Sequence, residues 1–175
     1  MIRKPIGEIL VQSHGLAREK LEEAIELQKT RGGRLGEVLV TLKAVTEDDV
    51  AKALCDQTGL TYLAEVRIDA IDPELVKDIP INFAKQFFVL PIQGGDGCHR
   101  VLVADPFDLA ALDSVSAILK GRITPVVSSK QKVTDAINAV YDKRARQAES
   151  VMGDLEEANL DDIAHELEEP EDLLD

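Results

Sequence analysis

Two segments of this chain repeat one pattern, 29 residues apart and without a gap. Residues 6–25 align with residues 35–54, and the matching positions include Gly7/Gly36, Glu8/Glu37, Leu10/Leu39, Val11/Val40 and Ala24/Ala53. Each copy is an apolar segment short enough for a two-turn helix, then a turn, then a longer amphipathic helix. Because one such helix pair cannot bury its apolar stripe alone, the repeat predicts that the two copies pack into a four-helix bundle-like subdomain over residues 1–58.

Local signals fix the ends of the predicted helices. Thr46 is a typical N-cap residue, and Asp49 stands three residues later, at the reciprocal position of a capping box. Gly59 marks the end of that helix. The preceding long helix, over residues 16–30, places Leu21 and Ile25 on one apolar stripe.

The pattern changes after Gly59. Residues 60–66 are predicted to form a short strand or an extended entry, and two brief helices are predicted over 72–79 and 81–87. Two apolar runs around the Gly-rich turn 94–97 then predict a hairpin. A helix over 105–121, capped by Asp105, a strand over 122–128 and a helix over 129–144 complete this part. The fold class is therefore α+β: the helical bundle is followed by a small mixed three-stranded sheet with helices over residues 59–146, with a right-handed helical crossover.

The charge is distributed very unevenly. The whole chain has a net charge of −13, yet all 20 basic residues lie at or before Arg146. Residues 147–175 carry 12 acidic residues and no basic one, which leaves the body at −1. The body has no basic stripe, so we expect no nucleic-acid partner. The acidic tail, 147–175, is predicted to be a disordered linker, with a partner-induced helix as the alternative, because its large apolar residues recur at roughly helical spacing.

Targeting and redox signals are weak. The first residues have no uninterrupted apolar stretch of a signal peptide, and no apolar run is long enough to cross a bilayer. We therefore expect a cytoplasmic protein without direct membrane insertion, peripheral to the membrane only through partners. Cys55 and Cys98 are predicted to be reduced, partly buried thiols.

The sequence has no recognisable catalytic constellation. It lacks a phosphate-binding loop of the Gly-x-x-x-x-Gly-Lys-Ser/Thr kind and a Gly-x-Ser-x-Gly elbow. Its three histidines and two cysteines have no metal-ligand spacing. We therefore expect no enzymatic activity, no metal and no resident cofactor.

The repeated glycine motif is the one candidate binding site. Arg34, Leu35 and Gly36 stand at the predicted start of a helix, where a glycine permits close backbone approach and free N–H groups favour an anion. Arg34 could pair with a phosphate or stack on a purine. Two copies of this turn would suit a ligand with two phosphates and two bases. The alternative is that Gly36 serves helix–helix packing and that Arg34 is simply solvated.

The chain resembles a known family. Three segments carry the resemblance: the paired Gly-Glu units of the repeat, "ALCDQTGLTYL", and "NFAKQFFVLPI" with "RVLVADPFDLAALDSV". Over roughly residues 3–142 the chain is similar to the N-terminal domain of the ATPases of type II secretion and type IV pilus assembly, which includes a cyclic di-GMP-binding version. The resemblance implies a non-catalytic module placed before a hexameric ATPase domain, which docks that motor to inner-membrane platform proteins.

The resemblance also implies a site for cyclic di-GMP, as the alternative function. Family members that bind this dinucleotide use tandem motifs that begin Arg-Leu-Gly and have a leucine three residues after the glycine. The second motif is intact in Arg34, Leu35, Gly36 and Leu39. The first has Pro5 in place of the arginine, followed by Ile6, Gly7 and Leu10. His14 and Lys43 occupy positions where the family often has glycine.

Overall fold

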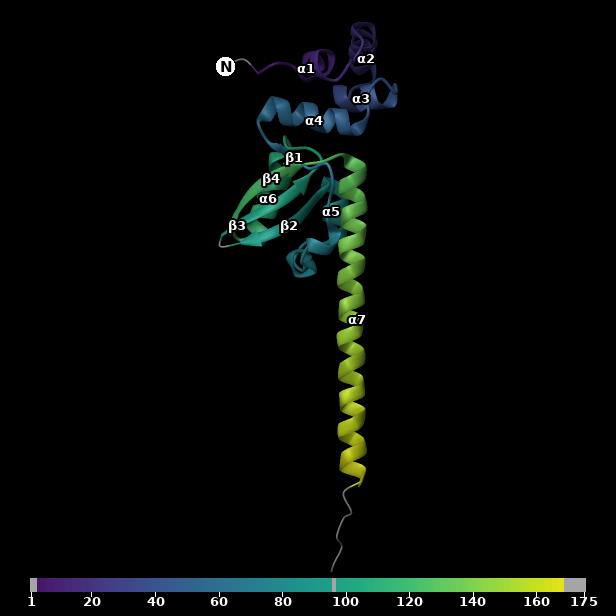
Figure 1. Cartoon of the computed structure of the whole chain (residues 1–175), viewed down its shortest axis with the longest axis vertical. Coiled ribbons are helices and arrows are strands. Elements are labelled where there is room, and N and C mark those ends of the chain that lie inside the picture. The colour runs from purple at the N-terminus through teal and green to yellow at the C-terminus, as the bar shows by residue number, and fades with distance from the viewer. Residues whose placement is uncertain (1–2, 96, 169–175) are drawn as a thin grey trace, which may run out of the picture.

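A computed structural model describes residues 3–95 and 97–168 of the chain. Four helices come first: α1 (Ile6–Ser13), α2 (Arg18–Arg31), α3 (Leu35–Thr41) and α4 (Glu47–Thr58). Then follow β1 (Thr61–Tyr62), two 3-10 turns, η1 (Ile68–Ala70) and η2 (Pro73–Val76), and α5 (Ile81–Phe87). The chain continues with β2 (Val89–Gly95), β3 (Cys98–Val103), α6 (Leu109–Leu119), β4 (Arg122–Val127) and α7 (Lys130–Glu168). Figure 1 shows the four-helix layer above the sheet, with α7 projecting away from both.

Helices α1–α4 form the helical subdomain that the repeat predicts. Its core is built from equivalent positions of the two copies, since Leu10 and Leu39 are both fully buried, as are Ala24 and Ala53. The predicted capping box is present, because the Thr46 side chain accepts a hydrogen bond from the backbone N–H of Asp49 while the Asp49 carboxylate accepts one from that of Thr46. Gly59 ends α4 in the left-handed conformation.

The second part is a small mixed sheet with the strand order β1-β4-β3-β2. Strands β2 and β3 form the predicted hairpin, with a register shift between Pro91 and Gln93. Strands β3 and β4, which α6 connects along the chain, pair in parallel. The predicted hairpin turn includes residue 96, which lies outside the described residues. The described sheet has four strands instead of three, because Thr61 and Tyr62 pair in parallel with the end of β4. The α+β fold class is thus confirmed.

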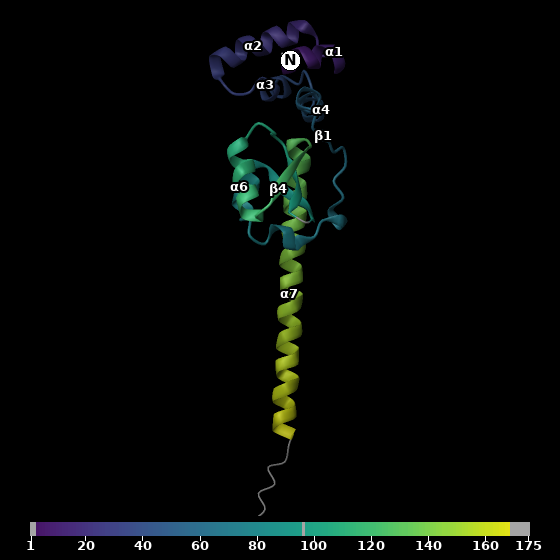
Figure 2. The ribbon, with the colours of Figure 1, turned by 90° about the vertical axis from the view of Figure 1, so that its left-hand side faces the viewer.

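Helices cover both faces of this sheet. Val101, Leu102 and Val103 are consecutive and fully buried, which requires cover on both faces because successive strand side chains point to opposite sides. Helix α6 contacts β4 and α7 contacts β2 and β3, and Figure 2 shows α6 standing to one side of the sheet. The helix α6 begins differently from the expectation, since Asp108 caps it, whereas Asp105 accepts a hydrogen bond from the N–H of Phe107 in the preceding turn.

Helix α4 joins the two parts. Its Ala53 belongs to the core of the helical subdomain, while Ala51 and Cys55 belong to the core around the sheet. One helix with two apolar faces therefore packs the two parts against each other.

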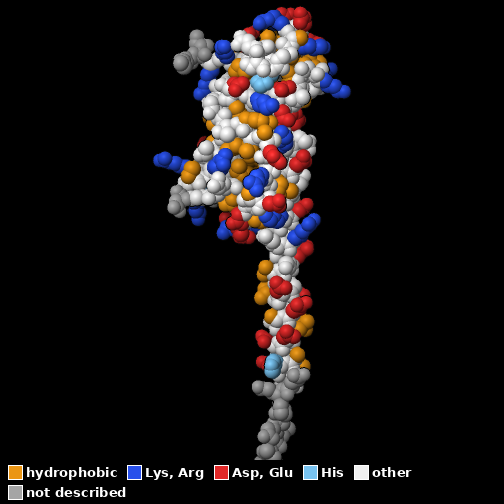
Figure 3. All heavy atoms as spheres, in the orientation of Figure 1, with side chains coloured by type: hydrophobic (Ala, Val, Ile, Leu, Met, Phe, Trp, Pro, Cys, Tyr) orange, Lys and Arg blue, Asp and Glu red, His pale blue; other side chains and the backbone are white. Residues whose placement is uncertain are grey.

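The acidic tail differs from the expectation over most of its length. Residues 147–168 continue α7 as a regular helix, whereas a disordered linker was expected; residues 169–175 lie outside the described residues. The first part of α7 packs on the sheet through Val133, Ala136, Ile137 and Val140. This packed part supplies the costly nucleus, and each further residue then adds a hydrogen bond. No proline interrupts the helix before Pro170. Figure 3 shows acidic and hydrophobic side chains along the projecting part.

Candidate functional site: a cleft between the two subdomains

A cleft of about 600 Å³ lies between the helical subdomain and the sheet. One wall is the start of α3 with part of α4, and the other is the turn after β3, the turn after β4 and the end of α5. The carboxyl ends of the parallel strands β3 and β4 thus open into it, which is where open α/β sheets commonly bind ligands. A volume of this size is within the range of small-molecule sites, roughly 300–1,000 Å³.

Arg34 reaches across this cleft. Gly32 and Gly33 both have positive φ, so the chain turns sharply after α2 and presents Arg34 in an extended conformation just before α3. The guanidinium of Arg34 forms an ion pair with the carboxylate of Asp105, which follows β3. The arginine that the sequence singles out therefore contacts the opposite wall of the cleft.

The other charged groups of the cleft are also paired. Nζ of Lys130 lies 3.6 Å from Oε1 of Glu37, and the backbone N–H of Gln131 donates to Glu47 at 3.0 Å. With Asp105 and Asp108, four carboxylates line the cleft against the two cations Arg34 and Lys130. An anionic ligand would therefore have to displace a carboxylate from each cation that it uses.

Aromatic side chains form the apolar part of the lining. Phe87, Phe88 and Phe107 contribute to it, together with aliphatic residues of α3 and α4. Nζ of Lys130 lies 4.5 Å from the centre of the Phe88 ring, a cation–π contact. Phe88 itself has a φ of 51°, which ends α5 and turns the chain into β2.

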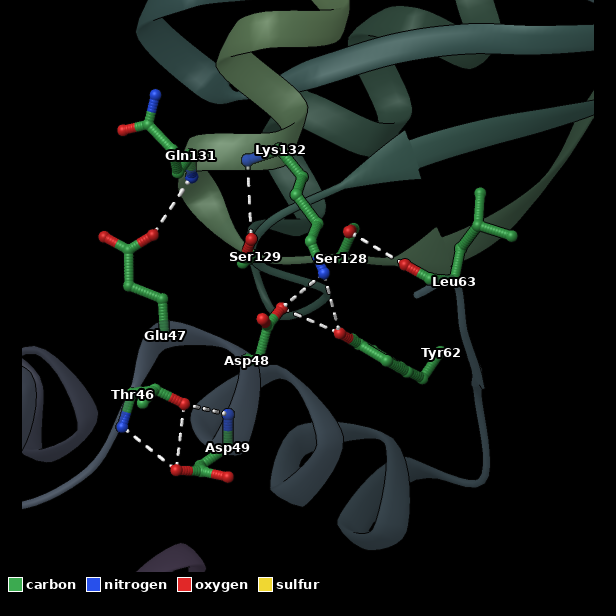
Figure 4. A network of polar contacts seen from close by, with 10 residues as sticks. All are labelled: Thr46, Glu47, Asp48, Asp49, Tyr62, Leu63, Ser128, Ser129, Gln131 and Lys132. Atoms are coloured by element: carbon green, nitrogen blue, oxygen red, sulfur yellow. Dashed lines mark hydrogen bonds and ion pairs between the residues drawn. The ribbon is translucent and has the colours of Figure 1, made fainter. Parts of the chain in front are cut away.

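A polar network beside the cleft ties α4 to β1 and α7 (Figure 4). Tyr62 donates to Oδ1 of Asp48 at 2.7 Å, and Nζ of Lys132 donates to the same oxygen at 2.9 Å. The hydrogen bond from Tyr62, and then that from Lys132, lower the pKa of Asp48. Burial, and then the hydrogen bond to Asp48, raise the pKa of Tyr62. This network stabilises the interface that forms the cleft.

Four of the seven predicted site residues line the cleft, namely Ile6, Arg34, Leu35 and Gly36. The other three do not reach it. Leu10 and Leu39 are fully buried in the helical core. Gly7 is also buried, and a Cβ atom there would lie 2.7 Å from Cδ1 of Leu21. The structure therefore brings Arg34, Leu35 and Gly36 of the second motif to the cleft, and from the first motif only Ile6.

Gly36 has a packing role as well as a place in the cleft. A Cβ atom built on Gly36 would lie 2.8 Å from Cγ1 of Val50, so α3 and α4 approach as closely as they do only because this residue has no side chain. Gly7 and Leu21 form the equivalent contact between α1 and α2. This geometry agrees with the alternative prediction that Gly36 serves helix–helix packing, and it gives Gly7 the same role.

The residues on the opposite wall, above all Asp105 and Lys130, are not among the predicted site residues. The sequence predicts only a helix-capping role for Asp105, and no spacing rule connects it to Arg34, 71 residues earlier. Among residues 3–95 and 97–168, no group of three or more possible metal ligands was found, and no helix is long and apolar enough to cross a membrane.

A helix-pair repeat packed through α4 onto a small mixed sheet, with a cleft between them, defines a two-part α+β module. A family model for the MshEN domain matches residues 59–147, just over half of the chain. The chain belongs to the MshEN domain family.

Relatives in secretion and pilus systems match more of the chain. It is 27% identical over 168 residues to the type IV pilus assembly ATPase PilB of Myxococcus xanthus, covering 96% of this chain and 29% of that protein. PilB of Thermus thermophilus is 33% identical, over 79% of this chain and 20% of its own length. Type II secretion system protein E of Xanthomonas campestris pv. campestris is 28% identical, over 87% of this chain and 27% of that protein. The chain thus spans less than a third of these relatives.

Solved structures support the same assignment. A structure of MshE with cyclic di-GMP superposes with a TM-score of 0.66 at 25% identity, over 79% of this chain and all of that one. The N-terminal domain of XpsE superposes with a TM-score of 0.59 at 23% identity, over 79% of this chain and 98% of that one. The chain therefore matches the N-terminal domain of these ATPases and not their catalytic domain, and the expected resemblance is confirmed.

Proposed function

We propose that this chain is a non-catalytic docking and regulatory domain of a type II secretion or type IV pilus assembly ATPase. In this proposal residues 1–58 and 59–146 are its two subdomains, and the domain couples a hexameric motor to inner-membrane platform proteins on the cytoplasmic side. The similarity to N-terminal regions of PilB and secretion protein E supports the motor context.

The observation that carries the docking role is an exposed apolar pair on the body. Phe107 and Leu109, at the start of α6, are 43% and 67% exposed, although the body buries most of its large apolar side chains. Exposed apolar side chains that lie together are typical of protein interaction surfaces. This pair stands at the mouth of the cleft, because Phe107 also lines it, so docking there would be sensitive to what the cleft contains.

Co-purification with the cytoplasmic domain of a platform protein from the same secretion or pilus system tests this role. Leu109→Glu should weaken the complex at least about tenfold, because burying a leucine contributes roughly 1.5–3 kcal/mol. An acidic residue in the first turn of α6 suits the helix dipole, so the fold should persist. Leu160→Glu is the matched control, since Leu160 is 65% exposed on the distant part of α7. No complex with the wild-type chain, or equal losses in both variants, would contradict the proposal.

The second candidate is a sensor that binds cyclic di-GMP in the cleft. It is favoured by the position of Arg34 in a cleft of sufficient volume and by the similarity to MshE, whose solved structure contains this dinucleotide. A ligand phosphate would replace the Asp105 carboxylate on the guanidinium of Arg34, since both groups bind the same donors. Binding would thus break the contact between α3 and the turn after β3.

Calorimetry with cyclic di-GMP tests the sensor. Arg34→Ala should abolish binding, whereas Asp105→Asn should strengthen it by roughly tenfold, because a neutral amide competes poorly for the guanidinium. Asp113→Asn, an exposed position on α6, makes the same charge change outside the cleft and should leave the affinity near that of the wild type. If Arg34→Ala binds cyclic di-GMP as tightly as the wild type does, this arginine is not part of the binding site.

A further inference from the structure

The projecting part of α7 has an uncovered apolar face. Between residues 147 and 168, six large apolar side chains are at least 53% exposed: Val151, Met152, Leu155, Leu160, Ile163 and Leu167. No other part of the described chain packs on them, since the packed residues of α7 end near Tyr141. An isolated helix in water derives little stability from propensity alone, and a persistent apolar face is typically buried against a partner.

The exposed apolar residues are concentrated toward one side of this helix. At about 100° per residue, Ala148, Met152, Leu155 and Ile163 fall within a sector of roughly 80°. On the same count, four of the eight acidic residues, Asp154, Glu157, Asp161 and Glu168, fall within about 60° on the opposite side. Of the others, Glu149, Glu156 and Asp162 flank the apolar sector, and Glu166 lies inside it near its end. Asn159 lies in the apolar sector, at the kind of position where one polar residue fixes the register of paired helices. We call the sector of Ala148, Met152, Leu155, Asn159 and Ile163 the α7 seam.

The negative charge of residues 147–168 indicates which class of partner the α7 seam can bind. Residues 147–168 contain eight acidic residues and no lysine or arginine. A second copy of this helix would bring like charges together along its whole length, and an anionic lipid surface or a nucleic acid would be repelled in the same way. A helix with lysines or arginines beside its own apolar face meets both requirements, because it buries the seam and neutralises the flanking carboxylates.

We propose that the α7 seam binds a basic amphipathic helix of a partner protein in a coiled-coil-like pair. This interaction surface is separate from the apolar pair at the start of α6, so it adds a second contact to the proposed docking domain. Its affinity combines apolar burial, which salt hardly affects, with charge pairing, which salt screens.

A three-heptad peptide with leucine at the a and d positions and lysine elsewhere is a suitable probe. Fluorescence anisotropy of the labelled peptide would measure its affinity for the full chain at low and at high ionic strength. A scrambled peptide of identical composition controls for charge alone. We expect the heptad peptide to bind at least tenfold more tightly than the scrambled one, and to retain part of this advantage at high salt.

The chain offers a matched pair of variants. Leu155 and Leu160 are the same residue type on the same helix, 59% and 65% exposed, but only Leu155 lies in the α7 seam. Leu155→Gln should weaken peptide binding about tenfold, and Leu160→Gln should have less than a third of that effect. Circular dichroism of both variants would verify that the helix persists.

Three outcomes would overturn the proposal. Equal binding of the heptad and scrambled peptides would show that only charge acts. Equal effects of Leu155→Gln and Leu160→Gln would show that the seam is not the contact. Self-association of the wild-type chain in sedimentation velocity, abolished by Leu155→Gln, would identify a second copy as the occupant. Each outcome is distinct from a failed platform complex, which is tested at Leu109.

Discussion

The two glycines of the repeat should respond differently to the same substitution. In Gly36→Ala, the new Cβ would meet Cγ1 of Val50 at 2.8 Å. In Gly7→Ala, it would meet Cδ1 of Leu21 at 2.7 Å. The distances are nearly equal, but the neighbours are not, since Cδ1 is the end of a flexible leucine while the branched valine has one strongly preferred rotamer in a helix.

The expected magnitudes follow from this difference. Overpacking a well-packed site costs typically about 1–3 kcal/mol. Replacing a helical glycine by alanine recovers at most about 1 kcal/mol, and less in the first turn where both glycines lie. Gly36→Ala should therefore lower the free energy of unfolding by about 1–2 kcal/mol, because α3 and α4 must separate. Gly7→Ala should change it by less than about 1 kcal/mol, because Leu21 can turn aside.

Urea denaturation followed by circular dichroism would measure both variants, and a double-mutant cycle would identify the contact. Val50→Ala removes the methyl groups that the new Cβ meets. The double variant Gly36→Ala/Val50→Ala should therefore lose about 1 kcal/mol less free energy of unfolding than the two single variants lose together. Additive effects, or a Gly36→Ala variant as stable as the wild type, would refute the close approach of α3 and α4 as the reason for this glycine.

Three further predictions concern single contacts. Thr46→Ala should lower the free energy of unfolding by about 1 kcal/mol in urea melts, because α4 loses its capping box, and an unchanged midpoint would contradict this. Burial raises the pKa of Cys55 to about 11, so at pH 8 a thiol reagent should modify only the exposed Cys98 of the native chain. The free energy of unfolding should fall as the pH rises from about 9 to 11, because in that range the Cys55 thiol ionises only in the unfolded chain. The lowered pKa of Asp48 means that its ionised carboxylate stabilises the fold at pH values above the ordinary carboxyl pKa. The wild type should therefore be more stable than Asp48→Asn by less than about 1 kcal/mol at neutral pH, and this difference should shrink between about pH 5 and pH 3. A difference that does not change with pH would contradict a stabilising role of the carboxylate.

Features with short-range causes were predictable from the sequence. The Thr46 capping box, the left-handed Gly59 and the helix pairs depend on residues within a few positions of one another, and the structure has them where the patterns place them. The start of α6 was not predicted correctly, because Asp105 and Asp108 are both plausible caps. The choice depends on Asp105 taking part in a different turn and in the ion pair with Arg34.

The sequence predicted only one wall of the candidate site. The motif around Gly36 drew attention to one wall of the cleft, but Asp105 and Lys130 come from segments 71 and 96 residues away from Arg34. Likewise, the acidic composition of residues 147–168 favoured disorder, whereas their connection to the packed start of α7 makes them helical.

The sequence by itself determined the repeat, both ends of α4, the α+β class and the concentration of the net negative charge in the tail, because each depends on local pattern or on composition. Only the tertiary structure decided that β1 joins the sheet beside β4, that Gly36 packs against Val50 and that Arg34 faces Asp105 across a cleft. These features depend on which distant surfaces bury each other, and the free energy of that burial is a property of the assembled fold and not of any one segment.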